Sequence, residues 1–150
     1  MKRLMFLLAL MACKPIAEVE PIKIEVTESY KELSEWEILE MAIMMTESRF
    51  NSEAEGRTND KGVFQITPVF VAEANRLSGR GYVHEDAYSI EKSLEMFDII
   101  QRRYNPDHSV EKAIKLHNPG GDSIGYEAKV RQNMDLIRRM EAARKALVER

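Results

Sequence analysis

The chain has 150 residues, one cysteine and a formal net charge of −3. This weakly acidic balance gives no sign of a nucleic-acid-binding protein, which concentrates positive charge on one face, and a lone cysteine cannot form an internal disulfide. The composition, 44% hydrophobic and 31% charged, is ordinary for a globular protein. The sequence has no P-loop, GxGxxG, HExxH or Cys/His metal-ligand spacing, so we predict no cofactor and no metal.

The first 13 residues have the layout of a secretion signal. A basic start precedes an apolar run at residues 4–11, and Ala12 and Cys13 follow. The run is too short to span a bilayer, which takes ~20 apolar residues. Residues 10–13, LMAC, resemble a bacterial lipobox. We therefore predict export to the cell envelope or periplasm, with lipidation of Cys13 as a membrane anchor; the alternative is an ordinary leader with an incidental cysteine.

Residues 14–32 are predicted to be a tether. They contain Pro15 and Pro21, five glutamates and no helical apolar stripe. Apolar residues alternate at positions 22, 24 and 26, so a short strand is the alternative. The remainder, residues 33–150, has the length of a single domain, commonly ~100–150 residues.

Residues 34–51 predict a helix that ends on an acid. Ser34 and Glu37 form a capping-box pattern, in which each side chain satisfies a backbone amide of the other. Apolar residues at positions 38, 41, 42 and 45 give one buried stripe.

Glu47 stands at the end of this run, before a polar turn. The negative end of the helix dipole favours the neutral form of an acid there, and apolar neighbours such as Met44 would act in the same direction. A carboxylic acid that stays protonated near neutral pH can serve as a general acid. The alternative is a solvated glutamate at a helix end.

Four further helices are predicted from capping residues followed by apolar stripes. A turn-rich loop at residues 52–66 and a second loop at residues 79–88 separate the first three helices. The four helices are expected at residues 67–78, 89–104 and 109–117, and from about residue 126 into a charged tail. The predicted fold is therefore mainly α, with about five helices and little or no β structure.

Several short motifs resemble those of the soluble lytic murein transglycosylase family, lysozyme-like enzymes of bacteria and phages. Residues 47–51, ESRFN, resemble its E-S-x-F-N motif, and residues 62–65, GVFQ, resemble G-L-M-Q. Residues 117–120, HNPG, resemble Y-N-A-G with His117 in place of the tyrosine, and Tyr126 falls where a later tyrosine is usual. The resemblance covers nearly all of residues 33–140, with the motifs in the family's order.

The resemblance implies a lysozyme-like domain with a groove for peptidoglycan glycan strands. Glu47 would be the single catalytic acid, cleaving the β-1,4 bond from N-acetylmuramic acid to N-acetylglucosamine and closing a 1,6-anhydro ring without a cofactor. The residues that would bind substrate are Ser48, Gln65, His117, Asn118 and Tyr126.

Each of these five residues also has a structural alternative. Ser48 would cap a turn, Gln65 would satisfy a loop carbonyl, and Asn118 would form an Asx turn with Pro119. His117 and Tyr126 would be core residues.

Two other functions remain open at this point. One is a lysozyme-type hydrolase, in which Asp60 acts as a second carboxylate. The other is a non-catalytic wall-binding protein on the same fold.

Overall fold

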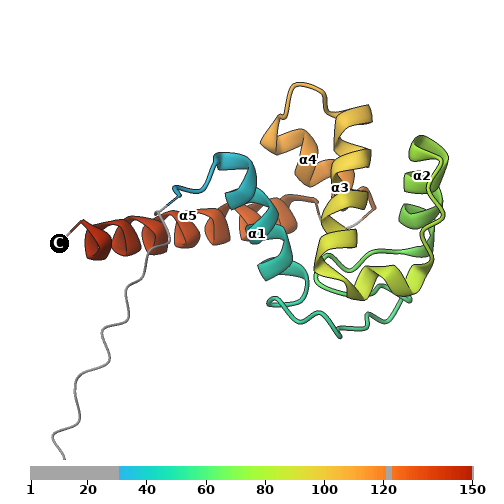
Figure 1. Ribbon diagram of the computed structural model, residues 1–150, viewed down its shortest axis with the longest axis horizontal. Coiled ribbons are helices and arrows are strands. Elements are labelled where there is room, and N and C mark those ends of the chain that lie inside the picture. The colour runs from blue at the N-terminus through green and yellow to red at the C-terminus, as the bar shows by residue number, and fades with distance from the viewer. Residues whose placement is uncertain (1–30, 121–122, 150) are drawn as a thin grey trace, which may run out of the picture.

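The computed structural model describes residues 31–120 and 123–149, and these residues form a helical protein (Figure 1). The predicted mainly α fold is confirmed: the described residues contain no strand, only isolated bridges from Glu55 to Lys61 and from Lys61 to Ile66. The elements in chain order are α1 (Glu35–Glu47), α2 (Pro68–Ser78), the 3-10 helix η1 (His84–Tyr88), α3 (Ile90–Tyr104), α4 (Val110–His117) and α5 (Ser123–Val148).

The helices begin where their capping residues predict. At α1 the amide of Ser34 donates to Glu37 at 2.7 Å, and the amide of Glu37 donates to the Ser34 hydroxyl at 3.2 Å. Thr67, Ser89 and Ser109 accept from first-turn amides of α2, α3 and α4 in the same way. These bonds satisfy amides that the helix itself leaves without partners.

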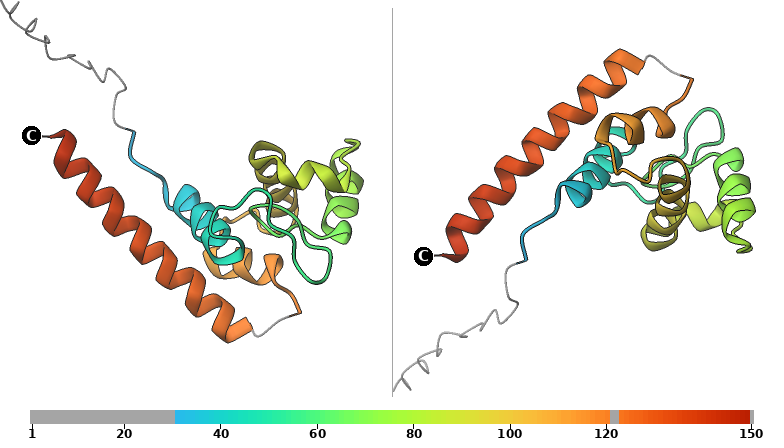
Figure 2. Two further views of the ribbon diagram at one scale, coloured as in Figure 1. Left: turned by 90° about the horizontal axis from the view of Figure 1, so that it is seen from below. Right: turned by 90° about the horizontal axis from the view of Figure 1, so that it is seen from above.

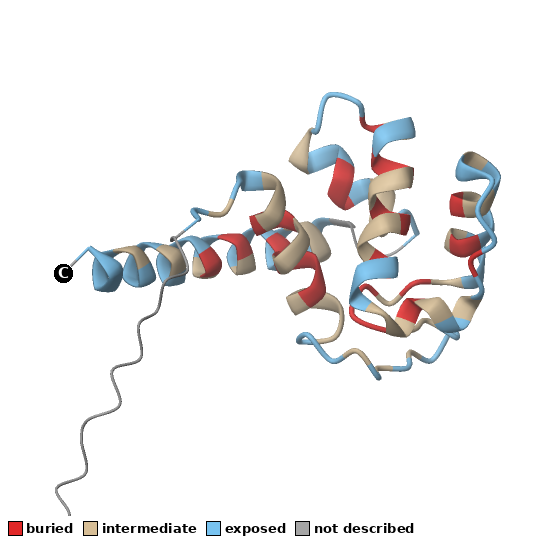
Figure 3. Ribbon diagram, viewed as in Figure 1, coloured by how far each residue is buried: buried red, intermediate tan, exposed pale blue. Residues whose placement is uncertain are grey.

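Helix α1 lies against α5, and α2 lies against α3. The short helix α4 contacts α1, α3 and α5, so its last residue lies near the end of α1. Buried residues gather on α1, α3 and the N-terminal half of α5, whereas the C-terminal half of α5 projects from the body (Figures 2 and 3). This packing brings the ends of α1 and α4 and the start of α5 together.

The loop between α1 and α2 is held closely against η1. Gly62 has a φ of +72°, and a Cβ there would lie 1.7 Å from the carbonyl oxygen of Ala87. Only glycine avoids that overlap and adopts this φ without cost. The close approach positions the next residues, Val63 and Phe64, in the core.

Two predicted boundaries differ from the structure. Residues 84–88, expected in a loop, form η1, in which Asp86 accepts from the Val83 amide at 2.9 Å. The last helix begins at Ser123 rather than near Tyr126, and the charged tail is part of it. Alternating charges along an exposed helix, such as the pair of Glu127 and Arg131, support helical structure without burial.

The predicted secretion signal, the lipobox Cys13, the tether up to residue 30 and the alternative strand at residues 22–26 lie outside the described residues. Within residues 31–120 and 123–149, none of the helices is both long enough and apolar enough to cross a membrane.

Candidate active site

Glu47 is the last residue of α1, and its side chain is 20% exposed. The chain reverses directly after it, because Arg49 and Phe50 adopt positive φ values of 56° and 64°. Non-glycine residues pay roughly 1–2 kcal/mol for such a conformation. Strained backbone of this kind is typical of functional sites, where the surrounding structure maintains it.

Two side chains from other helices meet one oxygen of Glu47. The hydroxyl of Tyr126, near the start of α5, donates a hydrogen bond to Oε1 at 2.5 Å. Nε2 of His117, the last residue of α4, lies 3.5 Å from the same oxygen and 2.9 Å from the carbonyl oxygen of Phe64. Both contacts fall on Oε1.

The ionisation of Glu47 differs from the expectation of a protonated acid. Burial raises the pKa of Glu47, but the contacts with His117, the hydrogen bond from Tyr126 and the positive charge of Lys129 outweigh it. The pKa therefore lies below the ordinary glutamate value. The expectation considered the dipole of α1 and apolar neighbours and was wrong, because donors from α4 and α5 stabilise the carboxylate.

Tyr126 remains a donor over the whole working pH range. Burial, together with the negative charge of Glu47, raises the pKa of its phenol far above the ordinary value. Tyr126 was expected either in the groove or in the core, and its hydroxyl is in fact bonded directly to Glu47.

The other predicted substrate-binding residues lie around this group. The single hydroxyl hydrogen of Ser48 is shared between the carbonyl oxygens of Met44 at 3.3 Å and Val63 at 3.1 Å, so Ser48 links the end of α1 to the loop. Its lone pairs remain able to accept from a substrate. Asn118 is the C-cap of α4, and its backbone amide donates to the carbonyl oxygen of Ile114.

Gln65 holds the loop together with its side-chain amide. Nε2 donates to the carbonyl oxygens of Gly62 at 2.9 Å and Ala54 at 3.2 Å. The backbone of Gln65 has a positive φ of 49°. Gln65 therefore has the structural role that was its alternative, and it also lines the adjoining pocket.

A pocket of about 530 Å³ lies beside Gln65 and His117, between α2 and α4. Its size is within the usual range for ligand sites, ~300–1,000 Å³. The remaining lining residues are Thr67, Val69, Phe70, Glu73, Ile100, Tyr104, Lys115, Leu116 and Pro119. Tyr104 and Lys115 had no predicted role, because neither residue lies within one of the motifs.

Asp60, the second carboxylate of the hydrolase alternative, is tied within its own turn. Thr58 donates to its Oδ2 at 2.6 Å, and its carbonyl oxygen accepts from the Gly56 amide at 2.8 Å. Within the described residues, Glu47 makes its hydrogen bond and its ion-pair contact with Tyr126 and His117, not with Asp60.

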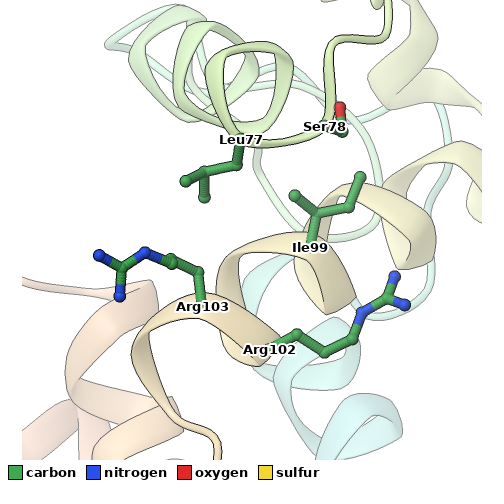
Figure 4. A pocket seen from close by; sticks show the side chains of 5 residues that line it. All are labelled: Leu77, Ser78, Ile99, Arg102 and Arg103. Atoms are coloured by element: carbon green, nitrogen blue, oxygen red, sulfur yellow. The ribbon is translucent and has the colours of Figure 1, made fainter.

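A second hollow, of about 360 Å³, lies between the C-terminal ends of α2 and α3 (Figure 4). Leu77, Ser78, Ile99, Arg102 and Arg103 line it. It contains none of the residues around Glu47, and we assign it no part in the site. Among the described residues, no group of three or more His, Cys, Asp or Glu side chains is arranged to hold a metal ion.

Comparison with known proteins identifies the family of this chain. The family described as Transglycosylase SLT domain matches residues 26–120, a range that contains Glu47, Gln65 and His117 and ends before Tyr126. No curated protein and no solved structure matches the chain. The family match covers more than half of the sequence and agrees with the helical fold and the motif order, so the chain belongs to the SLT transglycosylase family, whose activity on peptidoglycan is of the lytic transglycosylase type.

Proposed function

We propose that this protein is a lytic transglycosylase that cleaves the β-1,4 bond between N-acetylmuramic acid and N-acetylglucosamine. The observation that carries the proposal is the arrangement of Glu47. A single, mostly buried carboxylate has two donors on Oε1, and one of these donors, His117, also lines a pocket of about 530 Å³.

The proposed reaction uses Glu47 twice. The protonated form gives its proton from Oε2 to the glycosidic oxygen, and the bond from that oxygen to C1 breaks. The carbonyl oxygen of the substrate's own acetamido group stabilises the cationic C1, as in other substrate-assisted glycosidases. The C6 hydroxyl then attacks C1 and returns its proton to Glu47, so a 1,6-anhydro ring closes and water is not consumed.

The pKa of Glu47 lies below the ordinary glutamate value in the free protein, so near neutral pH the group is held as the carboxylate. The first step needs the protonated form. A bound sugar displaces water from the carboxylate, and this desolvation raises its pKa. We propose that substrate binding in this way protonates Glu47, which then donates that proton.

The neighbouring residues would orient the glycan. Ser48 would accept from the acetamido N–H through its free lone pairs, since its own hydrogen is used by backbone carbonyls. Gln65 and Asn118 would contact the sugar from the loop and from the end of α4. The aromatic and polar residues of the pocket, such as Phe70 and Tyr104, would line the glycan path.

Digestion of purified sacculi followed by mass spectrometry of the soluble muropeptides tests the proposal. We expect products with 1,6-anhydro ends from the wild type and none from Glu47→Gln, which is nearly isosteric and cannot act as an acid. General acid catalysis typically contributes ~10²–10⁴-fold, and here one residue acts as both acid and base. Glu35→Gln, at the exposed opposite end of α1, is the matched control.

The same experiment distinguishes the other two functions. Reducing ends that disappear in Asp60→Asn would identify a hydrolase. Binding to sacculi without any cleavage would identify a wall-binding protein. Near wild-type cleavage by Glu47→Gln would remove the central role of this residue.

We also propose that the protein is exported and anchored through a lipid on Cys13, on the basis of the leader sequence alone. Cells given a radiolabelled fatty acid should label the wild type and not Cys13→Ser. An unlabelled wild type would contradict the lipid anchor and would favour an ordinary leader with an incidental cysteine.

A further inference from the structure

His117 is buried beside Glu47 and fixed there by aromatic rings. Its side chain is only 4% exposed. The rings of Phe64, Phe70 and Phe97 approach its imidazole edge-on, with centroids 5.8, 5.9 and 5.9 Å away. A ring enclosed in this way has little freedom to rotate, because close-packed neighbours occupy the alternative positions.

The two ring nitrogens have different surroundings. Nε2 lies 2.9 Å from the carbonyl oxygen of Phe64, which can only accept, so Nε2 carries a hydrogen. Nδ1 is buried and has no hydrogen-bond partner within the described residues. A hydrogen on Nδ1 would be a buried donor without an acceptor, so the surroundings favour the neutral Nε2–H tautomer.

Within the described residues, this arrangement gives Nδ1 of His117 no group with which to exchange a proton. Nε2 already holds its hydrogen, and Nδ1 lies among phenyl rings without a polar partner. The remaining function of the ring is to direct the Nε2–H dipole at the backbone of Phe64 and at Oε1 of Glu47, 3.5 Å away.

On the basis of the proposed transglycosylase function, we propose that His117 is a positioning residue that orients the Glu47 carboxylate toward the substrate and stabilises its ionised form. The ring connects α4, the loop carbonyl of Phe64 and the end of α1. It contacts Oε1 beside the Tyr126 hydroxyl, so the carboxylate is held from α4 and from α5. The other charged or titratable groups that act on Glu47 are Tyr126 and Lys129 of α5.

Two substitutions separate this role from simple packing. His117→Phe keeps an aromatic ring among the three phenyl rings but removes the donor. His117→Gln supplies an N–H donor on a side chain of similar reach. If His117 only fills space, the two variants should differ in stability and not in the titration of Glu47.

The decisive measurement is the titration of the Glu47 carboxyl carbon by ¹³C NMR, alongside the pH profile of kcat/KM on soluble glycan fragments. In His117→Phe both midpoints should move up by ~0.5–1 pH unit, because a donor to the ionised form is lost. A loosely held carboxylate should also lower kcat by about tenfold or more with little change in KM. His117→Gln should stay close to the wild type in both midpoints.

An unchanged Glu47 titration in His117→Phe would overturn the proposal, as would equal losses in the Phe and Gln variants. If His117→Phe does not fold, ¹⁵N spectra of the wild-type imidazole decide: the Nε2–H tautomer near neutral pH supports the proposal, and the Nδ1–H tautomer contradicts it. A wild type that releases no anhydro products would instead refute the proposed function, while the NMR titration would still test the contact between His117 and Glu47.

Discussion

At the scale of single residues, the chemistry of Glu47 depends on partners that are distant in sequence. Tyr126 and His117 lie 79 and 70 positions further along the chain, yet both act on Oε1. Together they outweigh a burial that alone would raise the pKa. The same helix carries Glu40, another carboxyl group, whose surroundings shift its pKa in the opposite direction.

Tyr126→Phe should raise the pKa of Glu47 and lower kcat. The substitution removes a hydrogen bond to a charged group, worth ~1.5–3 kcal/mol, so we expect kcat to fall about tenfold or more. The alkaline limb of kcat/KM should move to higher pH, because the ionised form loses a donor. Tyr88→Phe is the matched control, since the Tyr88 hydroxyl donates to Glu55, in the loop between α1 and α2, and not to Glu47. Equal profiles for Tyr126→Phe and the wild type would show that the hydrogen bond does not set the ionisation.

Glu40→Gln should stabilise the protein above neutral pH. Burial raises the pKa of Glu40 to about 7, and the negative charges of Asp98 and Glu37 act in the same direction. Between the ordinary value of 4.5 and about 7, the folded state keeps a proton that the unfolded state has lost, so folding stability falls as pH rises. The neutral amide avoids that loss.

Thermal unfolding of the wild type and Glu40→Gln from acidic to mildly alkaline pH checks this. Because Glu40 is partly exposed, we expect the substitution to raise the free energy of unfolding by only about 1 kcal/mol, or Tm by a few degrees. The full difference should be reached at about pH 8. Glu91→Gln, an exposed carboxyl on α3, should show no such trend. A difference between wild type and variant that stays constant with pH would contradict the assignment.

At the scale of elements, the connection from α3 to α4 determines where His117 lies. Asn105 is fully buried, and its side-chain amide donates to Gln101 Oε1 at 3.0 Å and to the Ser109 carbonyl at 2.9 Å. Its Oδ1 accepts from the Ser109 amide at 3.0 Å. Ser109 in turn caps α4, so one side chain links the end of α3 to the beginning of the helix that ends on His117.

Asn105→Ala should destabilise the protein and reduce activity together. Buried groups that lose their partner cost ~1–3 kcal/mol each, so we expect a loss of about 2–3 kcal/mol in urea unfolding. Asn133→Ala is the control, because Asn133 is partly buried and makes one side-chain hydrogen bond, to Thr46. A loss no larger than that of the control would mean that the α3–α4 connection does not depend on Asn105.

At the scale of the whole molecule, the packing of α1, α4 and α5 predicts an acidic pH optimum. With the pKa of Glu47 below its ordinary value in the free protein, kcat/KM should fall about tenfold per pH unit above that pKa. The kcat limb should lie at higher pH, since the bound glycan desolvates the carboxylate. The reaction requires no second ionised carboxylate, so it predicts a shallow acidic limb while the protein stays folded.

Steady-state kinetics on soluble glycan fragments between about pH 3 and about pH 8 measure both limbs. Circular dichroism at each pH separates acid unfolding from loss of chemistry. A kcat/KM that stays level up to neutral pH would mean that Glu47 is protonated in the free protein, as the helix dipole alone predicts. A steep acidic limb in the folded protein that disappears in Asp60→Asn would indicate a second carboxylate.

The sequence by itself determined the features that depend on neighbouring residues. Ser34 with Glu37, Thr67 with Pro68, and the caps Ser89 and Ser109 begin their helices where predicted, since capping bonds join residues three positions apart. The end of α1 at Glu47 and the mainly α fold were predicted from apolar stripes and turn residues, which are local patterns too. The motif order was enough to indicate the family that the comparison confirms.

Only the tertiary structure decided how these parts act on one another. Nothing local to Glu47 indicates that an imidazole from α4 and a phenol from α5 meet on Oε1, because that contact follows from how the helices pack. Electrostatic shifts depend on distance in space, so the local dipole and the apolar neighbours gave the wrong sign for the pKa. The carbonyl of Phe64 beside His117 is likewise a product of the fold, since it requires Gly62 to pass within contact of Ala87.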